Sequence, residues 1–162
     1  VGFNGCMSAP DPHLLGPGLL PTPFTAAEIR DAAGPGKTIR IRIDLPDGTT
    51  ATRVNRFSET DAGGATLERW SLADRSDLST DRVTWLDLQR HAAFDAATTT
   101  VSTESLTTPL GEVECLRYDS EDGTFWFSLA HPGMPVQYES EGVRTTVVDI
   151  ERNPRANVAP PA

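Results

Sequence analysis

The stretch that decides the fold class runs from Thr38 to Leu72 and reads TIRIRIDLPDGTTATRVNRFSETDAGGATLERWSL. Its first residues alternate strictly, with isoleucines on one face and polar side chains on the other, which is typical of a strand with one buried face. The turn signals PDG at 46–48 and ETDAGG at 59–64 separate this run from two more strand-like runs, and an Asp-Gly pair strongly favours a hairpin. The stretch therefore predicts an antiparallel meander of three strands.

The second half of the chain predicts five further strands, separated by the turn-forming sequences TPLG, EDG and SEG. In the run TFWFSLA, the alternation places Phe125 and Phe127 on one face of the sheet and Trp126 on the other. The sequence HPG at 131–133 is predicted as a turn, because glycine accepts the positive φ that a type II turn requires. The five runs are TTTVSTES (98–105), EVECLRYDS (112–120), TFWFSLA (124–130), PVQYES (135–140) and VRTTVVDIE (143–151).

Two short helices are indicated by capping boxes, in which a threonine and an acidic residue three positions later satisfy each other's backbone amides. The first box is formed by Thr25 and Glu28, and its helix ends at the GPGK sequence of 34–37. The second box begins at Thr84 and predicts a helix over 85–94.

These elements predict a mainly β protein of the α+β class. We expect a strongly curved antiparallel sheet or half-barrel of about eight strands, with two short helices packed on its concave face. The polar sequence ADRSDLSTDR at 73–82 is predicted as a loop. The expected organisation is an extended, proline-rich lead at 1–23, a single curved-sheet domain at 24–153 and a flexible tail at 154–162.

Composition disfavours several classes of partner. The 162 residues include 14 basic and 23 acidic side chains, and the net charge of −9 opposes binding to nucleic acid or to an anionic membrane. The sequence contains no run of about 18 apolar residues, so no membrane-spanning helix is predicted. A cytoplasmic protein is expected. The alternative is a secreted or cell-envelope protein whose signal sequence has already been removed. Residues 1–6 are interpreted as an extension ahead of a start at Met7.

Residues with reactive side chains are few and widely spaced. The two cysteines form no CxxC pair and the three histidines form no HxxxH or HExxH pattern, so no metal site, no cofactor and no catalytic residue is predicted. Cys115 and Val113 share the apolar face of a predicted strand, and the acidic residues Glu112 and Glu114 alternate with them. This apolar, acidic setting predicts a core thiol with a raised pKa. A disulfide between Cys6 and Cys115 is left open as an alternative.

Five side chains are candidate ligand-binding residues: Trp70, Trp85, His91, Trp126 and His131. Curved sheets with an apolar interior host binding pockets. We therefore predict a small non-enzymatic domain that binds an apolar small molecule or a protein partner on the concave face, with its oligomeric state left open. Two alternatives remain: a hydrolase-like enzyme that uses His91, His131 and carboxylates of the cleft, and a structural subunit that pairs through a sheet edge.

Residues 108–153 resemble the closing strands of small bacterial proteins with curved sheets, the DUF3108 and TapB-like proteins. The matching positions are Gly111, Cys115, Trp126, Phe127, Gly133, Val136 and Tyr138. A second resemblance is to the lipoprotein-carrier fold, in which a similar strand pair ends in an asparagine like Asn153. Both resemblances imply a curved β-sheet, and neither implies a catalytic residue.

Overall fold

A computed structural model describes residues 11–152 of the chain. The described residues are mainly β, with nine strands in one antiparallel sheet and two short α-helices. The predictions for residues 1–6, Cys6, Asn153 and the tail at 154–162 lie outside the described residues. In chain order the elements are α1 (Ala26–Ala32), β1 (Thr38–Asp44), β2 (Thr50–Thr60), β3 (Gly64–Ser71), the 3-10 turn η2 (Arg75–Asp77), β4 (Ser79–Thr84), α2 (Trp85–Arg90), β5 (Thr100–Thr108), β6 (Gly111–Ser120), β7 (Gly123–Ser128), β8 (Gln137–Ser140) and β9 (Val143–Glu151).

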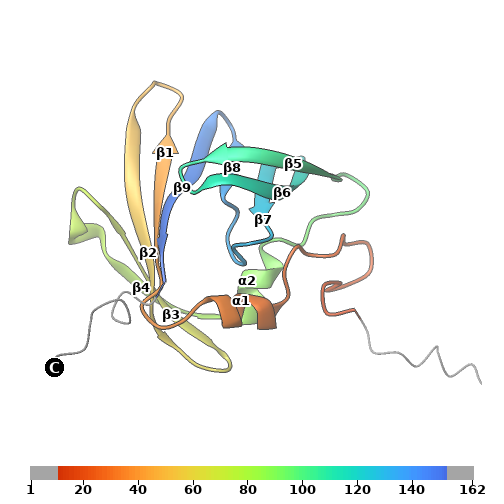
Figure 1. Ribbon diagram of the computed structural model, residues 1–162, viewed down its shortest axis with the longest axis horizontal. Helices are drawn as coiled ribbons and strands as arrows, with labels where there is room; N and C mark the ends of the chain where they lie inside the picture. Colours follow the sequence, from red (N-terminus) through yellow and green to blue (C-terminus); the bar gives the residue numbers. More distant parts are fainter. Residues whose placement is uncertain (1–10, 153–162) are drawn as a thin grey trace, which may run out of the picture.

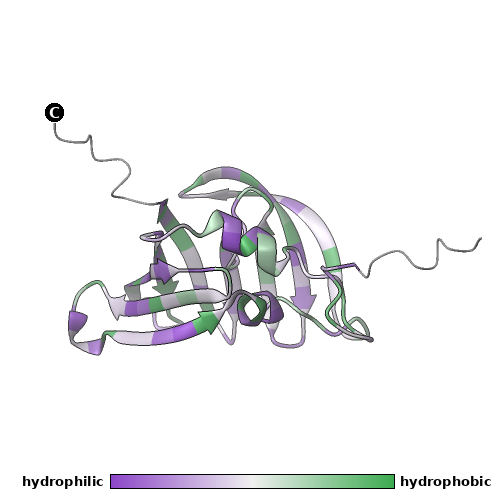
Figure 2. Cartoon of the chain, turned by 90° about the horizontal axis from the view of Figure 1, so that it is seen from below, coloured by the Kyte–Doolittle hydropathy of each residue, from purple (hydrophilic) through white to green (hydrophobic). Residues whose placement is uncertain are grey.

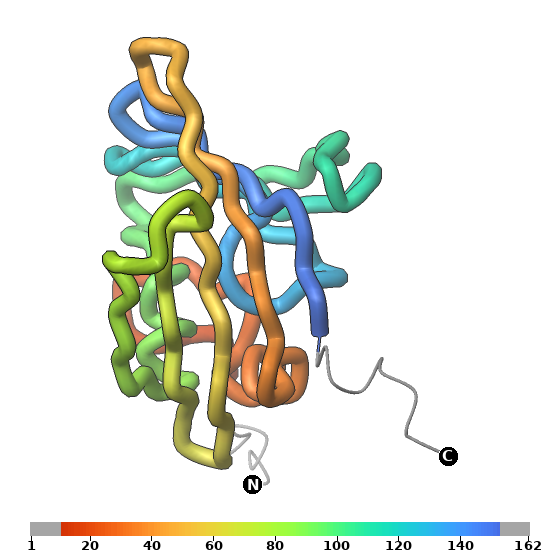
Figure 3. Tube along the Cα trace, turned by 90° about the vertical axis from the view of Figure 1, so that its left-hand side faces the viewer, coloured from red at the N-terminus to blue at the C-terminus, as the bar shows by residue number. Residues whose placement is uncertain are grey.

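The first and last strands of the chain lie side by side at the centre of the sheet. The strand order is β4-β3-β2-β1-β9-β8-β7-β6-β5, and every neighbouring pair is antiparallel. β1 therefore joins the N-terminal meander to the C-terminal strands through β9, with a bulge between Arg40 and Ile41 (Figures 1 and 3). In Figure 1 the strands β1 and β2 stand upright, whereas β5 and β6 run across them, so the strand direction turns along the sheet.

The predicted strands are confirmed, but the expected number of about eight was too low. The meander at 38–72 and all five C-terminal runs form strands. The additional strand is β4, which lies within the sequence predicted as a polar loop. It pairs with β3 at the edge of the sheet, and five of its six residues are exposed, so no apolar alternation indicates it. Backbone pairing with β3, rather than burial of side chains, makes this strand.

The second helix is shorter than predicted, because it ends at Arg90 and not at Phe94. The amides of Ala92 and Ala93 donate to carbonyls three residues earlier, which tightens the chain and ends the α-helix. Phe94 is released from the helix and stacks on Tyr118, with the ring centroids 5.0 Å apart.

Both helices begin at threonine caps and lie between the two halves of the sheet (Figure 2). Thr25 Oγ1 accepts a hydrogen bond from the Glu28 amide at 3.1 Å, and the Glu28 carboxylate accepts one from the Thr25 amide at 3.0 Å, which confirms the first capping box. Thr84 Oγ1 accepts a hydrogen bond from the Asp87 amide at 3.0 Å. Helices of seven and six residues are too short to be stable alone, so packing must hold them in place. No helix within residues 11–152 has the length and apolar character needed to cross a membrane.

Buried apolar side chains form two clusters, one on each face of the sheet. Phe127 belongs to the larger cluster, which packs under the helices, whereas Trp126 belongs to the smaller cluster with Val113, Cys115 and Val136. This separation confirms the alternation predicted for the run TFWFSLA. The buried members of the larger cluster are Phe24, Ile29, Ala33, Ile39, Ile41, Phe57, Ala65, Leu67, Trp85, Ala92, Tyr118, Phe127 and Val147.

Gln89 of α2 connects the proline-rich lead to both helices. Its side-chain nitrogen donates to the Pro12 carbonyl at 2.8 Å and to Thr22 Oγ1 at 2.9 Å. Its side-chain oxygen accepts a hydrogen bond from the Ala26 amide, at the start of α1, at 2.8 Å. The side chain is buried, and it satisfies three polar groups of the lead and of α1, which lie 63 to 77 residues away from it in the sequence.

We expect Gln89→Leu to lower the free energy of unfolding by roughly 2–4 kcal/mol, because the change removes three hydrogen bonds that are buried or partly buried. Urea melts followed by circular dichroism measure the loss. Gln137→Leu is the matched control, because Gln137 is also buried but makes no side-chain hydrogen bond with the described residues. A loss no larger than that of the control would show that Gln89 does not hold the lead and the helices together.

Candidate functional site

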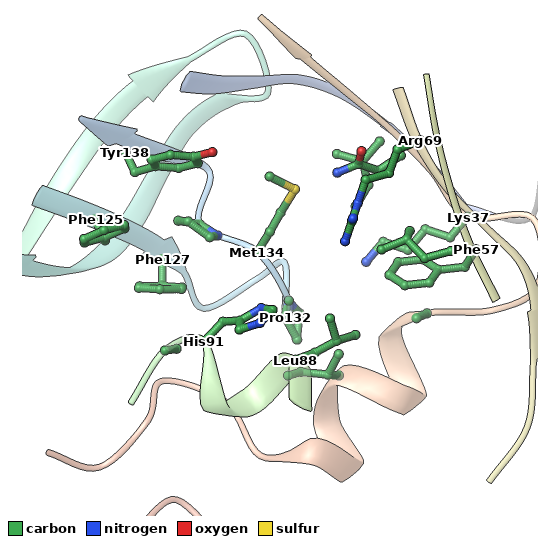
Figure 4. Close-up of a pocket in the computed structure, with 18 residues that line it drawn as sticks. Lys37, Phe57, Arg69, Leu88, His91, Phe125, Phe127, Pro132, Met134 and Tyr138 are labelled. Carbon is green, nitrogen blue, oxygen red and sulfur yellow. The ribbon is translucent and has the colours of Figure 1, made fainter. Parts of the chain in front are cut away.

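A cavity of about 320 Å³ lies between the sheet and the two helices. In Figure 4 the helices form its floor, strands β1 to β3 form one wall, and β7 and β8 form the opposite wall. The volume is at the lower end of the range that small-molecule sites occupy. Most of the side chains that line the cavity are apolar.

The first wall is built by side chains that alternate onto the helix-facing side of the N-terminal meander. The cross-strand pairs are Ile39 with Asn55, Asn55 with Arg69, and Phe57 with Leu67. All five side chains line the cavity. The same alternation that predicts the meander therefore builds this wall, because residues two apart on a strand share a face.

The opposite wall is aromatic. Phe125 and Phe127 of β7 and Tyr138 of β8 line the cavity there. The rings of Phe125 and Tyr138 stack across the two strands with their centroids 5.7 Å apart. Between the walls, the floor is closed by Leu88 and Ala92, from α2 and the turn that follows it.

The loop at 129–136 brings Met134 into the cavity. This loop is longer than the predicted turn, because β8 begins at Gln137 and not at Pro135. Gly133 has a φ of +133°, in agreement with the positive φ predicted for it. Figure 4 shows the Met134 side chain reaching into the space between the two walls. Its flexible thioether adapts easily to apolar partners of different shape.

Lys37, the chain's only lysine, extends into this largely apolar space. Its carbonyl accepts a hydrogen bond from the Phe57 amide at 2.9 Å, which extends the strand pairing and places its side chain on the same face as Ile39. The residue is 3% exposed, and burial, followed by repulsion from Arg152, lowers its pKa from 10.5 to about 8. Ten close charge pairs form among residues 11–152, and none of them includes Lys37.

The ionisable groups of the cavity wall are basic or neutral, although the whole chain has a net charge of −9. Arg69 and His91 line the cavity with Lys37, and none of the described lining residues is an aspartate or a glutamate. Arg69 Nη1 lies 3.8 Å from Asp81 Oδ2 on the neighbouring strand, so the charge of Arg69 is partly balanced. The cavity is therefore a local positive region in an acidic protein.

His131 lies beside the cavity but is not part of its lining. Its Nδ1 atom is buried and has no hydrogen-bond partner among the described residues. Burial lowers the pKa of the imidazole, and the positive charges of Arg152 and Lys37 lower it further. This direction favours a neutral His131 at neutral pH.

Of the five predicted ligand-binding residues, only His91 is placed in the cavity lining. Trp85 lies in the core next to the cavity, with its ring centroid 6.1 Å from that of Phe57. Its indole N–H donates to the Asp61 carbonyl at 2.8 Å, so both its apolar and its polar contacts are satisfied within the fold.

The other two tryptophans lie on the opposite face of the sheet, each under an arginine. The Arg75 guanidinium is 4.5 Å from the centroid of the Trp70 ring. Arg117 lies 5.2 Å from the centroid of the Trp126 ring, and the Trp126 indole N–H donates to Glu104 Oε2 at 2.6 Å. These contacts account for both side chains as packing residues.

Lys37, Arg69, Met134 and Tyr138 are among the lining residues that sequence reasoning did not select as binding residues. A signal was present for Lys37, which is the chain's only lysine and stands two residues before Ile39 in the alternating run. The other three depend on strand register and on the path of the loop at 129–136, which short-range patterns do not determine.

The remaining reactive groups lie away from the cavity. Cys115 is buried on the opposite face, and burial, then the nearby Glu104 and Glu114, raise the pKa of its thiol to about 11. This agrees with the prediction of a core thiol. Within residues 11–152, no three His, Cys, Asp or Glu side chains come together in an arrangement suited to a metal ion.

Comparison with known proteins gives a match of fold alone. No protein-family model and no curated protein matches the chain. The crystal structure of MucB is similar, with a TM-score of 0.53 and 11% sequence identity over 83% of this chain. The chain spans 57% of the length of that MucB chain. The match supports, at the level of the fold, the resemblance to known sheet proteins noted for residues 108–153.

Proposed function

We propose that this domain is a non-enzymatic binding protein that holds an apolar small molecule in the cavity between its helices and its sheet. The observation that carries the proposal is a cavity of about 320 Å³ lined mainly by apolar side chains. Protein interiors are otherwise closely packed, and an unfilled apolar space forfeits dispersion contacts. An apolar ligand would supply these contacts, and its transfer from water into the cavity would itself be favourable.

The proposal includes a sheet that wraps around the ligand as a half-barrel. Arg69 on β3 and Phe125 on β7 line one cavity, although five strand spacings separate β3 from β7 in the sheet order. In a flat sheet these strands would lie roughly 24 Å apart, at about 4.8 Å for each spacing. A cavity of this size that receives side chains from both strands supports strong curvature.

The two alternatives have less support than binding. A hydrolase-like site would need His91, His131 and a carboxylate together, but His91 alone belongs to the cavity lining and no described lining residue is acidic. Pairing through a sheet edge would use β4 or β5, the two outer strands, and it stays a prediction. The protein partner and the cellular compartment also stay predictions.

Fluorescence titration with the neutral apolar dye N-phenyl-1-naphthylamine tests the proposed function. We expect one saturable site per chain, because the dye would leave water and enter the cavity. Met134→Trp should abolish this site by filling the space between the walls. Leu129→Trp is the matched control from the same loop, because Leu129 is 56% exposed and does not line the cavity. Absence of dye binding, or equal binding by both variants, would contradict the proposal.

A further inference from the structure

We infer that the ligand is an anionic amphiphile with one alkyl chain, whose carboxylate or phosphate head group binds Lys37 and Arg69. The inference rests on the proposed function and adds the chemical class of the ligand. In Figure 4, Lys37 and Arg69 point into the cavity from the side of β1 to β3, and the aromatic side chains of β7 and β8 face them. One side of the cavity therefore suits an anion, and the other suits an alkyl chain.

The isolation of Lys37 is the first argument. A buried ammonium group is unfavourable unless a partner of opposite charge or several hydrogen bonds compensate for its lost hydration. Lys37 is 3% exposed, yet none of the described carboxylates pairs with it. The charged neighbours that lower its pKa or share its wall, Arg152 and Arg69, are also positive. A bound anion would supply the missing partner.

The distribution of acidic residues is the second argument. The chain has 23 aspartates and glutamates, but none of them is among the described residues that line the cavity. An acidic surface repels anions, so an anionic ligand would be retained only where positive groups are concentrated. The cavity wall is such a place, and its arginine presents the planar donor group that suits carboxylate and phosphate oxygens.

The shape of the cavity supplies the third argument. Phe125, Phe127 and Tyr138 form a continuous aromatic surface opposite the two cations, with Met134 between them. A volume of about 320 Å³ is at the lower end for small-molecule sites, which favours a single alkyl chain over a lipid with several chains.

Calorimetric titration of the full chain at pH 7 tests the inference with three probes that share one alkyl chain. The probes are dodecanoate and dodecyl phosphate, each used below its critical micelle concentration, and dodecanol, used below its solubility limit. Lys37→Met removes the cation while keeping a side chain of similar length. Arg40→Met is the matched control, because Arg40 is exposed on the outer face of β1 and its loss changes the net charge equally.

We expect Lys37→Met to weaken binding of the anionic probes at least about tenfold, because a charge-assisted hydrogen bond is lost. Dodecanol affinity should change less than about twofold, and Arg40→Met should change none of the three affinities by more than this. A larger dependence on Lys37 for one anionic probe would identify the preferred head group, and either preference supports the inference.

Two failures are distinguishable. Suppose that wild type binds dodecanol. The inference is then wrong, and the proposed function stands, if Lys37→Met binds both anionic probes as tightly as wild type does, or if wild type binds neither anionic probe. If wild type binds none of the three probes, the proposed function itself fails, and the inference fails with it.

Discussion

Trp126→Ala is expected to lower the free energy of unfolding by roughly 3–5 kcal/mol, a large share of the 5–15 kcal/mol or so that stabilises a typical domain. Trp126 is 5% exposed and is the largest side chain of the smaller apolar cluster, where it packs with Val113, Cys115 and Val136. Its truncation would open a cavity on this face of the sheet. It would also remove the donor that Glu104 Oε2 accepts from.

His131→Ala is the matched comparison, five residues further along the chain. We expect it to change the free energy of unfolding by less than about 0.5 kcal/mol, because the side chain makes no hydrogen bond with the described residues and its buried Nδ1 atom has no partner to lose. Guanidinium melts of the two variants measure both effects. A Trp126→Ala protein with an unchanged midpoint would show that this tryptophan is not a core residue.

Lys37→Met is expected to raise the free energy of unfolding at pH 7 by roughly 3 kcal/mol. The fall in the pKa of Lys37 from 10.5 to about 8 means that the folded state disfavours the charged form by about this amount. Methionine fills a similar volume and carries no charge that must be desolvated. Arg40→Met, on the exposed face of β1 three residues further along the chain, should stay within about 0.5 kcal/mol of wild type. A gain of this size would indicate that the fold keeps Lys37 for binding rather than for stability.

The same burial gives wild-type stability a pH dependence of defined sign. Between pH 8 and pH 10.5 the unfolded chain retains the Lys37 proton more than the folded chain does, so this contribution makes stability rise with pH. The penalty is complete below pH 8 and disappears as the pH passes 10.5. Arg152 stays charged throughout this window, so its repulsion of Lys37 does not titrate.

Lys37→Met has no such group, so the stability difference between variant and wild type should shrink from roughly 3 kcal/mol towards zero over this pH range. Urea melts of both proteins at several pH values measure the difference. If the difference were constant between pH 7 and pH 10, the ammonium group of Lys37 could not be buried as the structure places it.

Sequence periodicity was sufficient for the fold wherever one face of a strand is buried. The alternation at 38–44 and at 124–130 predicted both the strands and the faces of their side chains. β4 was missed because its side chains are exposed and its backbone pairing with β3 alone makes it a strand. The end of α2 was missed because local turns after Arg90, and not a proline or glycine, stop the helix.

The binding residues were harder to predict, because alternation shows which side chains share a face but not which face the helices cover. Trp70 and Trp126 were chosen for their size, yet they lie on the face away from α1 and α2. Arg69, the direct neighbour of Trp70, lines the cavity instead. That choice depends on contacts between segments distant in sequence, such as those that Gln89 makes with the lead and with α1.

The central claim is that an apolar molecule occupies the cavity, and the methyl group of Met134 reports on this directly. The chain has two methionines, so labelling their methyl groups with carbon-13 gives a simple spectrum, in which Met134→Leu assigns the Met134 signal. We predict that titration of wild type with dodecanol shifts this signal and that the shift saturates at one ligand per chain, because Met134 lies between the two walls of the cavity. A Met134 signal that stays unchanged up to the solubility limit of dodecanol would contradict the account.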